Sequence, residues 1–247
     1  MKKVLGIALV ILVALVFLPG IVPQATADSD HTLRQRIFVH YPKPEPGKKP
    51  PKPPAGPTCT TVTGGDQVAD FLWAGWQMPV GGVTYKINIT SAPKGIQTTV
   101  TQALDTAFAT WHMADPAQVF TYDGVTGIRV ARYDGKNVIA WKGIDCSAIA
   151  ITYVWYWADT KELAEVDTMF NKNLPWAVSP YTQPCIQSDA YDVQNIATHE
   201  FGHWVGLDDL YADIDSELTM YGYGALGELK KDTLGAGDIA GVLAVAP

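Results

Sequence analysis

Two histidines and two carboxylates stand close together near the C-terminal end of the chain. His199 and His203 are four residues apart, Glu200 follows the first histidine, and Asp209 lies six residues after the second. On a helix, residues four apart lie on one face a single turn apart, so both imidazoles could reach one divalent cation. Asp209 would add a third ligand, and Glu200 would stand next to it as a base. These residue types at this spacing predict metal-assisted hydrolysis.

The elements that must position these groups are a helix and the turn that ends it. Gly206 lacks a Cβ and can adopt the left-handed conformation, so it ends the helix and turns Asp209 toward the histidines. Three protein ligands would leave the fourth zinc position open for water, as a catalytic site requires. Two histidines stacked on a helix surface are the simpler alternative, but they explain neither the glutamate, the glycine nor the aspartate.

This motif resembles that of the metzincin metalloproteases, most closely the matrixin group. It reads HExxHxxGxxD, with aspartate as the last ligand where matrixins have histidine, as in the snapalysin-type small bacterial metzincins. The resemblance implies that Zn²⁺ is the cofactor. The metal ligands it implies are His199, His203 and Asp209, and the catalytic residue it implies is Glu200.

Two later segments resemble further parts of this family. Residues 216–221 (SELTMY) resemble the Met-turn, which in the family lies beneath the metal, with Met220 as its defining residue. Residues 234–245 resemble the final helix. The resemblance therefore implies an α+β catalytic domain: a mixed twisted sheet with an active-site helix, a Met-turn and a C-terminal helix. Since no histidine lies between His112 and His199, we expect the structural zinc of vertebrate matrixins to be absent.

Hydrophobic periodicity predicts the elements that precede the motif. Residues 83–90 alternate as a strand, and residues 97–113 place apolar side chains at helical spacing. Residues 128–133 and 138–141 flank a turn and are predicted as a hairpin. Residues 149–157 form a bulky extended run. Their first part resembles the family's substrate-side strand, and a buried central strand is the alternative.

The N-terminal residues predict export. Met1, Lys2 and Lys3 precede an apolar run, and an Ala-x-Ala pattern ends at Ala27, so residues 1–27 are predicted to be a signal peptide. An uncleaved membrane anchor is the alternative. Residues 28–58 are predicted to be a short segment followed by a Pro/Lys-rich tether, and residues 59–247 the catalytic domain. A proline-recognition ligand or a wall-spanning stalk is the alternative for the tether.

Composition narrows the classes of partner. The chain has 247 residues, a formal net charge of −7 and 17% charged residues, which is too little charge for a disordered protein. The acidic balance argues against a nucleic-acid partner, because binding a phosphate backbone needs clustered cations. We expect a secreted or cell-surface monomer that acts on protein or peptide substrates and touches a membrane only if the apolar N-terminus is retained.

The cysteines and acidic residues leave alternatives open. Export favours one disulfide among Cys59, Cys146 and Cys185, and we favour Cys146 with Cys185 because Cys59 lies at the domain edge. A latent bond from Cys59 to zinc is the alternative. Calcium could bind among four oxygen-bearing residues, although ordinary turn and surface carboxylates explain them as well. These residues are Asp134, Asn137, Glu165 and Asp167.

The function implied by the resemblance is zinc-dependent peptide-bond hydrolysis. Zinc held there would lower the pKa of a water from near 16 toward about 7 and polarise the scissile carbonyl. Glu200 would take the proton and pass it to the leaving amine. Tyr221 or Tyr223 could assist or shape the specificity pocket. Two alternatives stay open: a catalytically silent, surface-tethered binding protein on the same zinc scaffold, and an amidase acting on cell-wall peptides.

Overall fold

The computed structural model describes residues 31–44, 68–144, 147–179 and 189–246. The predicted signal peptide, most of the Pro/Lys-rich tether and all three cysteines lie outside these residues. The strands are β1 (Leu33–Pro42), β2 (Val83–Ile87), β3 (Phe120–Val125), β4 (Asn137–Lys142), β5 (Ala150–Trp157), β6 (Leu163–Asn171), β7 (Trp176–Ala177), β8 (Tyr191–Asp192) and β9 (Tyr223–Gly224). The helices are α1 (Val100–Ala114), α2 (Val193–Trp204) and α3 (Ala236–Ala244), with short 3-10 turns at Ile89–Ser91, Asp213–Asp215 and Lys230–Asp232.

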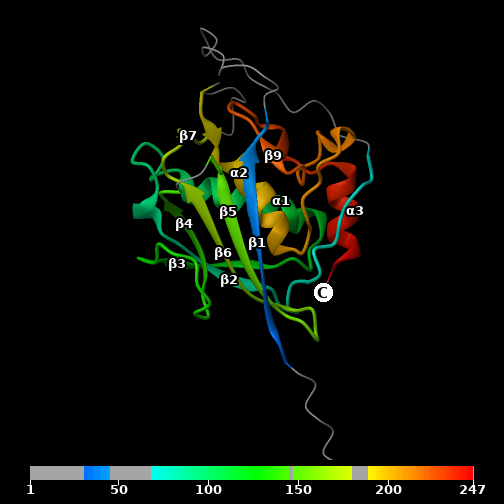
Figure 1. The fold of residues 1–247 in the computed structure, drawn as a ribbon. Helices are drawn as coiled ribbons and strands as arrows, with labels where there is room; N and C mark the ends of the chain where they lie inside the picture. Colours follow the sequence, from blue (N-terminus) through cyan, green and yellow to red (C-terminus); the bar gives the residue numbers. More distant parts are fainter. Residues whose placement is uncertain (1–30, 45–67, 145–146, 180–188, 247) are drawn as a thin grey trace, which may run out of the picture. The chain divides into compact units, whose positions relative to one another are not determined.

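Seven strands form one mixed sheet (Figure 1). Their order is β3-β2-β4-β6-β5-β1-β9, and β7 pairs with β8 in a separate two-stranded sheet. Strands β3, β2, β4 and β6 run parallel to one another, whereas β5 is antiparallel to both β6 and β1. The α+β class with a mixed sheet is thus confirmed.

Aromatic side chains join the two long helices. The rings of Phe108 on α1 and Phe201 on α2 stack with centroids 3.7 Å apart. The indole N–H of Trp111 on α1 donates to the carbonyl of Thr198 on α2 over 2.8 Å. Trp111 is fully buried, so this hydrogen bond satisfies the polar edge of a large core side chain. The contacts fix α2 against α1 and leave its opposite side toward the sheet.

Most predicted elements are present, and one is not. The strand at 83–90, the helix at 97–113, the strand at 149–157 and the final helix at 234–245 are confirmed as β2, α1, β5 and α3. The hairpin prediction is wrong, because residues 128–133 form no strand and β4 instead pairs in parallel with β2 and β6.

Buried carboxylates explain the missing strand. The backbone N–H of Arg132 donates to Asp167 over 3.0 Å, and that of Asp134 donates to Glu165 over 2.9 Å. These donors are therefore taken by side chains of β6 and do not enter a strand ladder. Alternating hydrophobicity alone could not reveal this competition.

The N-terminal segment differs from its predicted place. The sequence assigned residues 28–58 to a segment and tether ahead of the catalytic domain, but residues 33–42 form β1 inside the main sheet. The sequence IFVHY in this segment is rich in branched and aromatic residues, which favours a strand, yet no local signal showed which strand would pair with it. Within the part of the chain that the structure describes, no helix is long and apolar enough to cross a bilayer.

Candidate metal centre

Helix α2 begins and ends with local sequence signals. The Asp192 carboxylate accepts the N–H of Asn195 over 3.0 Å and caps the first turn. After the last turn, Gly206 adopts φ +99°, and a Cβ at this position would lie 2.2 Å from the carbonyl oxygen of Trp76. Only glycine fits both the backbone conformation and the space. The predicted role of Gly206 as the residue that turns the chain is confirmed.

This turn brings the three predicted ligands together. The ligand atoms of His199, His203 and Asp209 lie within 4.8 Å of one another. Oδ1 of Asp209 is 3.2 Å from Nε2 of His199 and 3.7 Å from Nε2 of His203. All three residues are buried. The neighbouring Asp208 points elsewhere, since its carboxylate accepts a hydrogen bond from Arg36 over 2.9 Å.

The hydrogen bonds of the histidines fix which nitrogen faces the centre. Nδ1 of His199 lies 2.7 Å from the carbonyl of Thr219, and Nδ1 of His203 lies 2.9 Å from that of Leu207. A carbonyl only accepts, so each Nδ1 carries the proton and donates it. Each Nε2 therefore presents a lone pair, the form in which a neutral imidazole binds a metal.

Two buried acceptors face one another at this centre. Nε2 of His199 and Oδ1 of Asp209 have no hydrogen-bond donor in the part of the chain that the structure describes. Burial lowers the pKa of His199 to about 4, so its ring is neutral at pH 7. These two unsatisfied acceptors are 3.2 Å apart, and in a site without water their lone pairs repel each other. A cation between them would remove this repulsion and would satisfy both acceptors. The donor set of two imidazoles and a carboxylate fits zinc.

Electrostatics favour the charged form of the third ligand. Burial by itself raises the pKa of the Asp209 carboxyl, but attraction to His203 and His199, when these rings are protonated, and to Lys231 lowers it to about 2. Tyr211 also contributes a hydrogen bond, donating its hydroxyl to Oδ2 of Asp209 over 3.2 Å. One carboxylate oxygen is thus held by a tyrosine while the other faces the histidines.

Glu200 lies beside the three ligands, and both of its carboxylate oxygens have partners. Oε1 is 3.1 Å from Nδ1 of His40 on β1, and Oε2 accepts the hydroxyl of Thr152 on β5 over 2.5 Å. The side chain is fully buried, and burial raises its pKa to about 8. Burial therefore makes this side chain hold a proton more tightly than an exposed glutamate does.

A chain of hydroxyls connects Glu200 to the core. Trp204 donates its indole N–H to Thr168 over 3.0 Å, and the Thr168 and Thr152 hydroxyls are 2.9 Å apart. Thr152 has one hydroxyl proton and donates it to Glu200, so between the two threonines Thr168 is the hydrogen-bond donor and Thr152 the acceptor. The direction of these hydrogen bonds leaves Oε2 of Glu200 as an acceptor.

A buried lysine also lies beside the metal centre, and the sequence analysis did not identify it. Lys231 is fully buried, and its ammonium donates to the carbonyl of Tyr221. The same nitrogen lies 3.3 Å from Nε2 of His40 and 3.4 Å from Nδ1 of His199. Burial lowers its pKa to about 8. Nothing in the sequence around Lys231 or His40 marks either residue, because each arrives from a segment distant in the chain.

The Met-turn residue lies beneath α2. Met220 is buried, and a Cβ added at Gly202 of α2 would lie 2.1 Å from its sulfur. The glycine therefore lets the turn approach the helix at the level of the two histidines. Tyr221 and Tyr223, which the sequence places near the specificity pocket, have ring centroids 5.6 Å apart, and Tyr221 is buried. Their predicted role in substrate recognition stays a prediction.

The residues named for calcium have other partners. Asp167 accepts the backbone N–H groups of Arg132 and Val138, and Glu165 accepts that of Asp134. The amide oxygen of Asn137 accepts the N–H of Val166 over 2.7 Å. The described contacts match the turn-carboxylate alternative, and calcium binding at this place stays a prediction.

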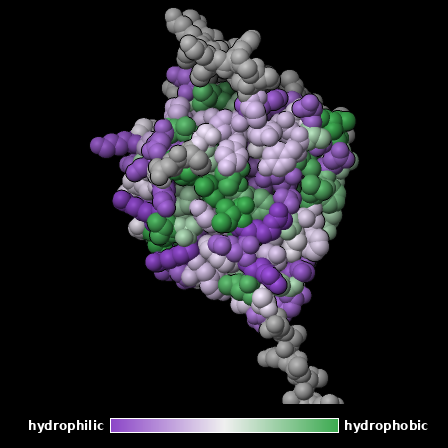
Figure 2. Space-filling model, in the orientation of Figure 1, coloured by the Kyte–Doolittle hydropathy of each residue, from purple (hydrophilic) through white to green (hydrophobic). Residues whose placement is uncertain are grey.

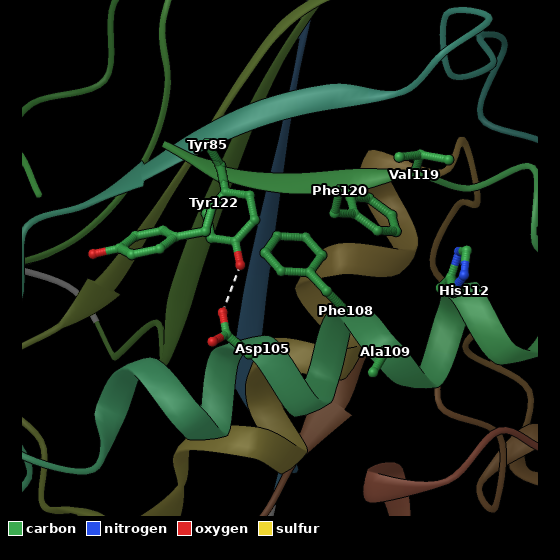
Figure 3. Close-up of a pocket in the computed structure, with 8 residues that line it drawn as sticks. All are labelled: Tyr85, Asp105, Phe108, Ala109, His112, Val119, Phe120 and Tyr122. Atoms are coloured by element: carbon green, nitrogen blue, oxygen red, sulfur yellow. Dashed lines mark hydrogen bonds between the residues drawn. The ribbon is translucent and has the colours of Figure 1, made fainter. Parts of the chain in front are cut away.

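A pocket of about 420 Å³ lies between α1 and the strands β2 and β3 (Figure 3). Its lining includes Tyr85, whose hydroxyl donates to Asp105 over 2.6 Å, and His112 in the last turn of α1. His112 donates from Nδ1 to the carbonyl of Gln118 over 2.9 Å. None of the predicted metal ligands lines this pocket, so it is separate from the metal centre.

Comparison with known proteins agrees with this geometry. The family model described as Matrixin, of the M10 peptidases, matches residues 75–245, which include α2, the Met-turn and α3. No curated protein matches the chain.

Proposed function

The chain belongs to the matrixin family of zinc metallopeptidases, and from this premise we propose that it is a secreted endopeptidase. In this proposal His199, His203 and Asp209 hold the zinc, and Glu200 is the general base. The observation that carries the proposal is the pair of buried acceptors, Nε2 of His199 and Oδ1 of Asp209, 3.2 Å apart with no described donor. Such a pair is stable only around a cation.

The residues around the metal centre have distinct roles in the proposed hydrolysis. When bound, zinc would supply Lewis-acid polarisation of the scissile carbonyl and acidify the attacking water. Glu200 would take the proton of that water and give it to the leaving amine. Thr152 keeps the carboxylate oriented through its hydroxyl. The backbone carbonyls of Thr219 and Leu207 hold the ligand rings in place.

The sequence supports export of this enzyme. The charged start, the apolar run and the Ala-x-Ala pattern before Asp28 are those of a secretory signal peptide. Cleavage after Ala27 would release an acidic protein outside the cytoplasm, where peptide bonds of other proteins are its substrates.

Metal content and hydrolysis test the proposal together. The full chain should contain one zinc, and a chelator should remove both the zinc and the hydrolysis of unfolded casein. Glu200→Gln should keep the zinc and lose hydrolysis, whereas Glu162→Gln, an exposed glutamate, should change neither. A chain without zinc, or a Glu200→Gln variant within about tenfold of the parent rate, would overturn the proposal, since general acid–base catalysis contributes about 10²–10⁴-fold.

A further inference from the structure

Helix α2 carries a second pair of residues at the spacing of the two histidines. Glu200 and Trp204 each follow one of the histidines His199 and His203, so they too are four apart. Residues four apart lie on one face of a helix, a single turn from each other. Since successive residues are about 100° apart around a helix, this pair lies beside the histidine pair. One face of α2 therefore holds the proposed ligands, and the adjacent face holds Glu200 and Trp204.

The second pair faces two threonines of the sheet. Helix α2 packs against β5 and β6 (Figure 1), and Glu200 and Trp204 are fully buried. Thr152 on β5 and Thr168 on β6 are directly opposite each other in the antiparallel pairing. Their hydroxyls are 2.9 Å apart, and neither side chain has exposed surface. A cross-strand threonine pair thus lies under the helix face that carries the proposed base.

The other face of these strands is exposed. Figure 2 shows apolar side chains gathered over the middle of this outer face, with hydrophilic side chains around them. Ile37 of β1, which is opposite Tyr153 of β5, is 52% exposed. The threonine hydroxyls are on the inner side, between the sheet and α2, where they have no contact with solvent. Bulk water therefore cannot replace a hydrogen-bond partner that they lose.

The four side chains form one chain of hydrogen bonds that begins and ends on α2. Trp204 donates its indole N–H to Thr168 over 3.0 Å, and Thr152 donates its hydroxyl to Oε2 of Glu200 over 2.5 Å. The contact between the two hydroxyls joins these hydrogen bonds across the strands. The helix is thus tied to the sheet at two points one turn apart. These ties restrain the rotation of α2 about its axis and hold the carboxylate of Glu200 at one oxygen.

The indole at one end sets the direction of every hydrogen bond in this chain. An indole N–H only donates, whereas a hydroxyl can donate its single proton to either of two neighbours. If Thr152 donated to Thr168, the proton of Thr168 would have no acceptor among its described contacts, because its other neighbour is the N–H of Trp204. A buried donor without an acceptor is unfavourable. Trp204 therefore keeps the hydroxyl of Thr152 directed at Glu200.

We propose that Trp204 and Thr168 are positioning residues that act through Thr152 and give the two oxygens of Glu200 different roles. Oε2 stays a hydrogen-bond acceptor, and Oε1 takes the proton of the attacking water and returns it to the leaving amine. This inference rests on the proposed function, because it assigns the atom that moves the proton in the proposed hydrolysis.

The partners of the two oxygens support this assignment. A proton on Oε2 would have to be donated to Thr152, and the proton of Thr152 would then turn to Thr168 against the direction set by the indole. Oε1 has no such constraint, since its neighbour is Nδ1 of His40 at 3.1 Å, and an imidazole nitrogen can accept as well as donate. With Oε2 held, Oε1 also keeps a constant position relative to the ligands on the adjacent face of α2.

Isosteric substitutions in the full chain test the positioning role. Thr168→Val removes the hydroxyl and keeps the shape. For casein hydrolysis, kcat should fall at least about tenfold while KM stays within about twofold, because only the accepting oxygen is displaced. Thr168→Ser restores a hydroxyl and should recover most of this loss. Thr121→Val, at an exposed threonine of β3, is the control, and the zinc content should be equal in all variants.

A double substitution separates the positioning role from a general effect on structure. Thr152→Val breaks the last link to Glu200 and should lower kcat at least about tenfold. If Thr168 acts through Thr152, adding Thr168→Val should lower kcat by no more than about a further twofold, because residues that act in one network are not additive. Losses that multiply, or a Thr168→Ser variant as slow as Thr168→Val, would overturn the inference.

A variant at the indole keeps the test open if Thr168→Val does not fold. Trp204→Phe removes the donated N–H and leaves both hydroxyls in place. We expect it to lower kcat at least about threefold in the parent and to have no further effect in Thr152→Val. An equal loss in both backgrounds would show that Trp204 acts by packing and would contradict the positioning role.

Neutron diffraction from the deuterated full chain tests the direction of the hydrogen bonds without any hydrolysis. We expect the deuteron of Thr168 to point at Thr152, and that of Thr152 to point at Oε2 of Glu200. A deuteron bound to Oε2, or one on Thr152 that points at Thr168, would overturn the inference. A parent chain that hydrolyses no casein would instead overturn the proposed peptidase, and the deuteron positions would still decide the direction of the chain.

Discussion

The carboxylate of Asp238 on α3 holds the backbone of Thr219 in the Met-turn. Oδ2 of Asp238 accepts the N–H of Thr219 over 2.8 Å, and Oδ1 accepts the N–H of Met220 over 3.0 Å. The carbonyl of the same Thr219 receives the Nδ1 proton of His199. The final helix therefore orients a proposed metal ligand through one residue of the turn.

Asp238→Ala should weaken zinc binding although Asp238 is no ligand. Loss of a partner that orients a ligand typically costs about 10–100-fold in metal affinity. Competition with a chelator of known affinity measures it. Asp238→Asn keeps an acceptor oxygen and should lie between the parent and Asp238→Ala, and Ile239→Ala on the exposed side of α3 should not change the affinity. Unchanged affinity in Asp238→Ala would contradict the orienting role.

His203→Ala should abolish tight zinc binding, whereas Asp208→Ala should retain it. His203 presents its Nε2 to the centre, but the Asp208 carboxylate binds Arg36 and the N–H of Asp209. Elemental analysis of both purified variants makes the comparison. Loss of zinc in Asp208→Ala, with zinc kept in Asp209→Ala, would mean that the turn after Gly206 presents the other carboxylate.

Glu200→Gln should lower the hydrolysis rate by about 10²–10⁴-fold. An amide is isosteric with the carboxylate and can still accept the Thr152 hydroxyl, but it cannot take a proton from water. Zinc content should be unchanged. The measurement is the initial rate of casein hydrolysis, and a rate close to that of the parent would assign the base to another residue.

Gly206→Ala should destabilise the whole domain by about 2 kcal/mol or more. The position has φ +99°, and the added Cβ would lie 2.2 Å from the Trp76 carbonyl oxygen. Gly95→Ala is the matched control, because a Cβ there meets nothing within 4 Å and the backbone is not left-handed. Urea unfolding compares the two. Equal midpoints would show that the chain relaxes around Gly206 at little cost.

The stability difference between the parent and Asp167→Asn should depend on pH. Burial raises the pKa of Asp167 to about 7, against about 3.9 in an unfolded chain. The folded state thus binds the proton more tightly, and this contribution is complete below pH about 4 and lost as pH rises toward 7. Relative to Asp167→Asn, the parent should lose up to about 1.4 kcal/mol per pH unit in that window.

Denaturant unfolding from pH 4.5 to 8 measures this difference. The amide of Asp167→Asn cannot ionise, so the stability of this variant should not fall through titration at this position. A difference that stays constant with pH would mean that Asp167 is already ionised in the folded protein throughout this range.

The sequence predicted the parts of the site that lie within one segment. His199, Glu200 and His203 are set by helical spacing, and Gly206 by the need for a residue without Cβ, so local rules were enough for the motif. The fold class and α1, α2 and α3 followed from periodicity and resemblance.

The parts that could not be predicted come from long-range pairing. His40, Thr152 and Lys231 surround Glu200 and His199 from three different segments, and none carries a local signal of that role. The wrong prediction of a strand at 128–133 has the same cause, a long-range contact. Backbone N–H groups of this segment donate to carboxylates on β6 instead of to another strand. Sheet order and buried polar contacts depend on the assembled core, which spacing rules do not describe.

The place of β1 at the beginning of the chain has a consequence for biosynthesis. His40 is translated 160 residues before Glu200, the carboxylate it contacts. Residues 33–42 have no strand to pair with until β5 has been made. The pairing must then overcome the entropy cost of closing a large loop. A nascent chain therefore carries His40 long before Glu200 exists, and β1 can join the sheet only after the whole of β5 has been made.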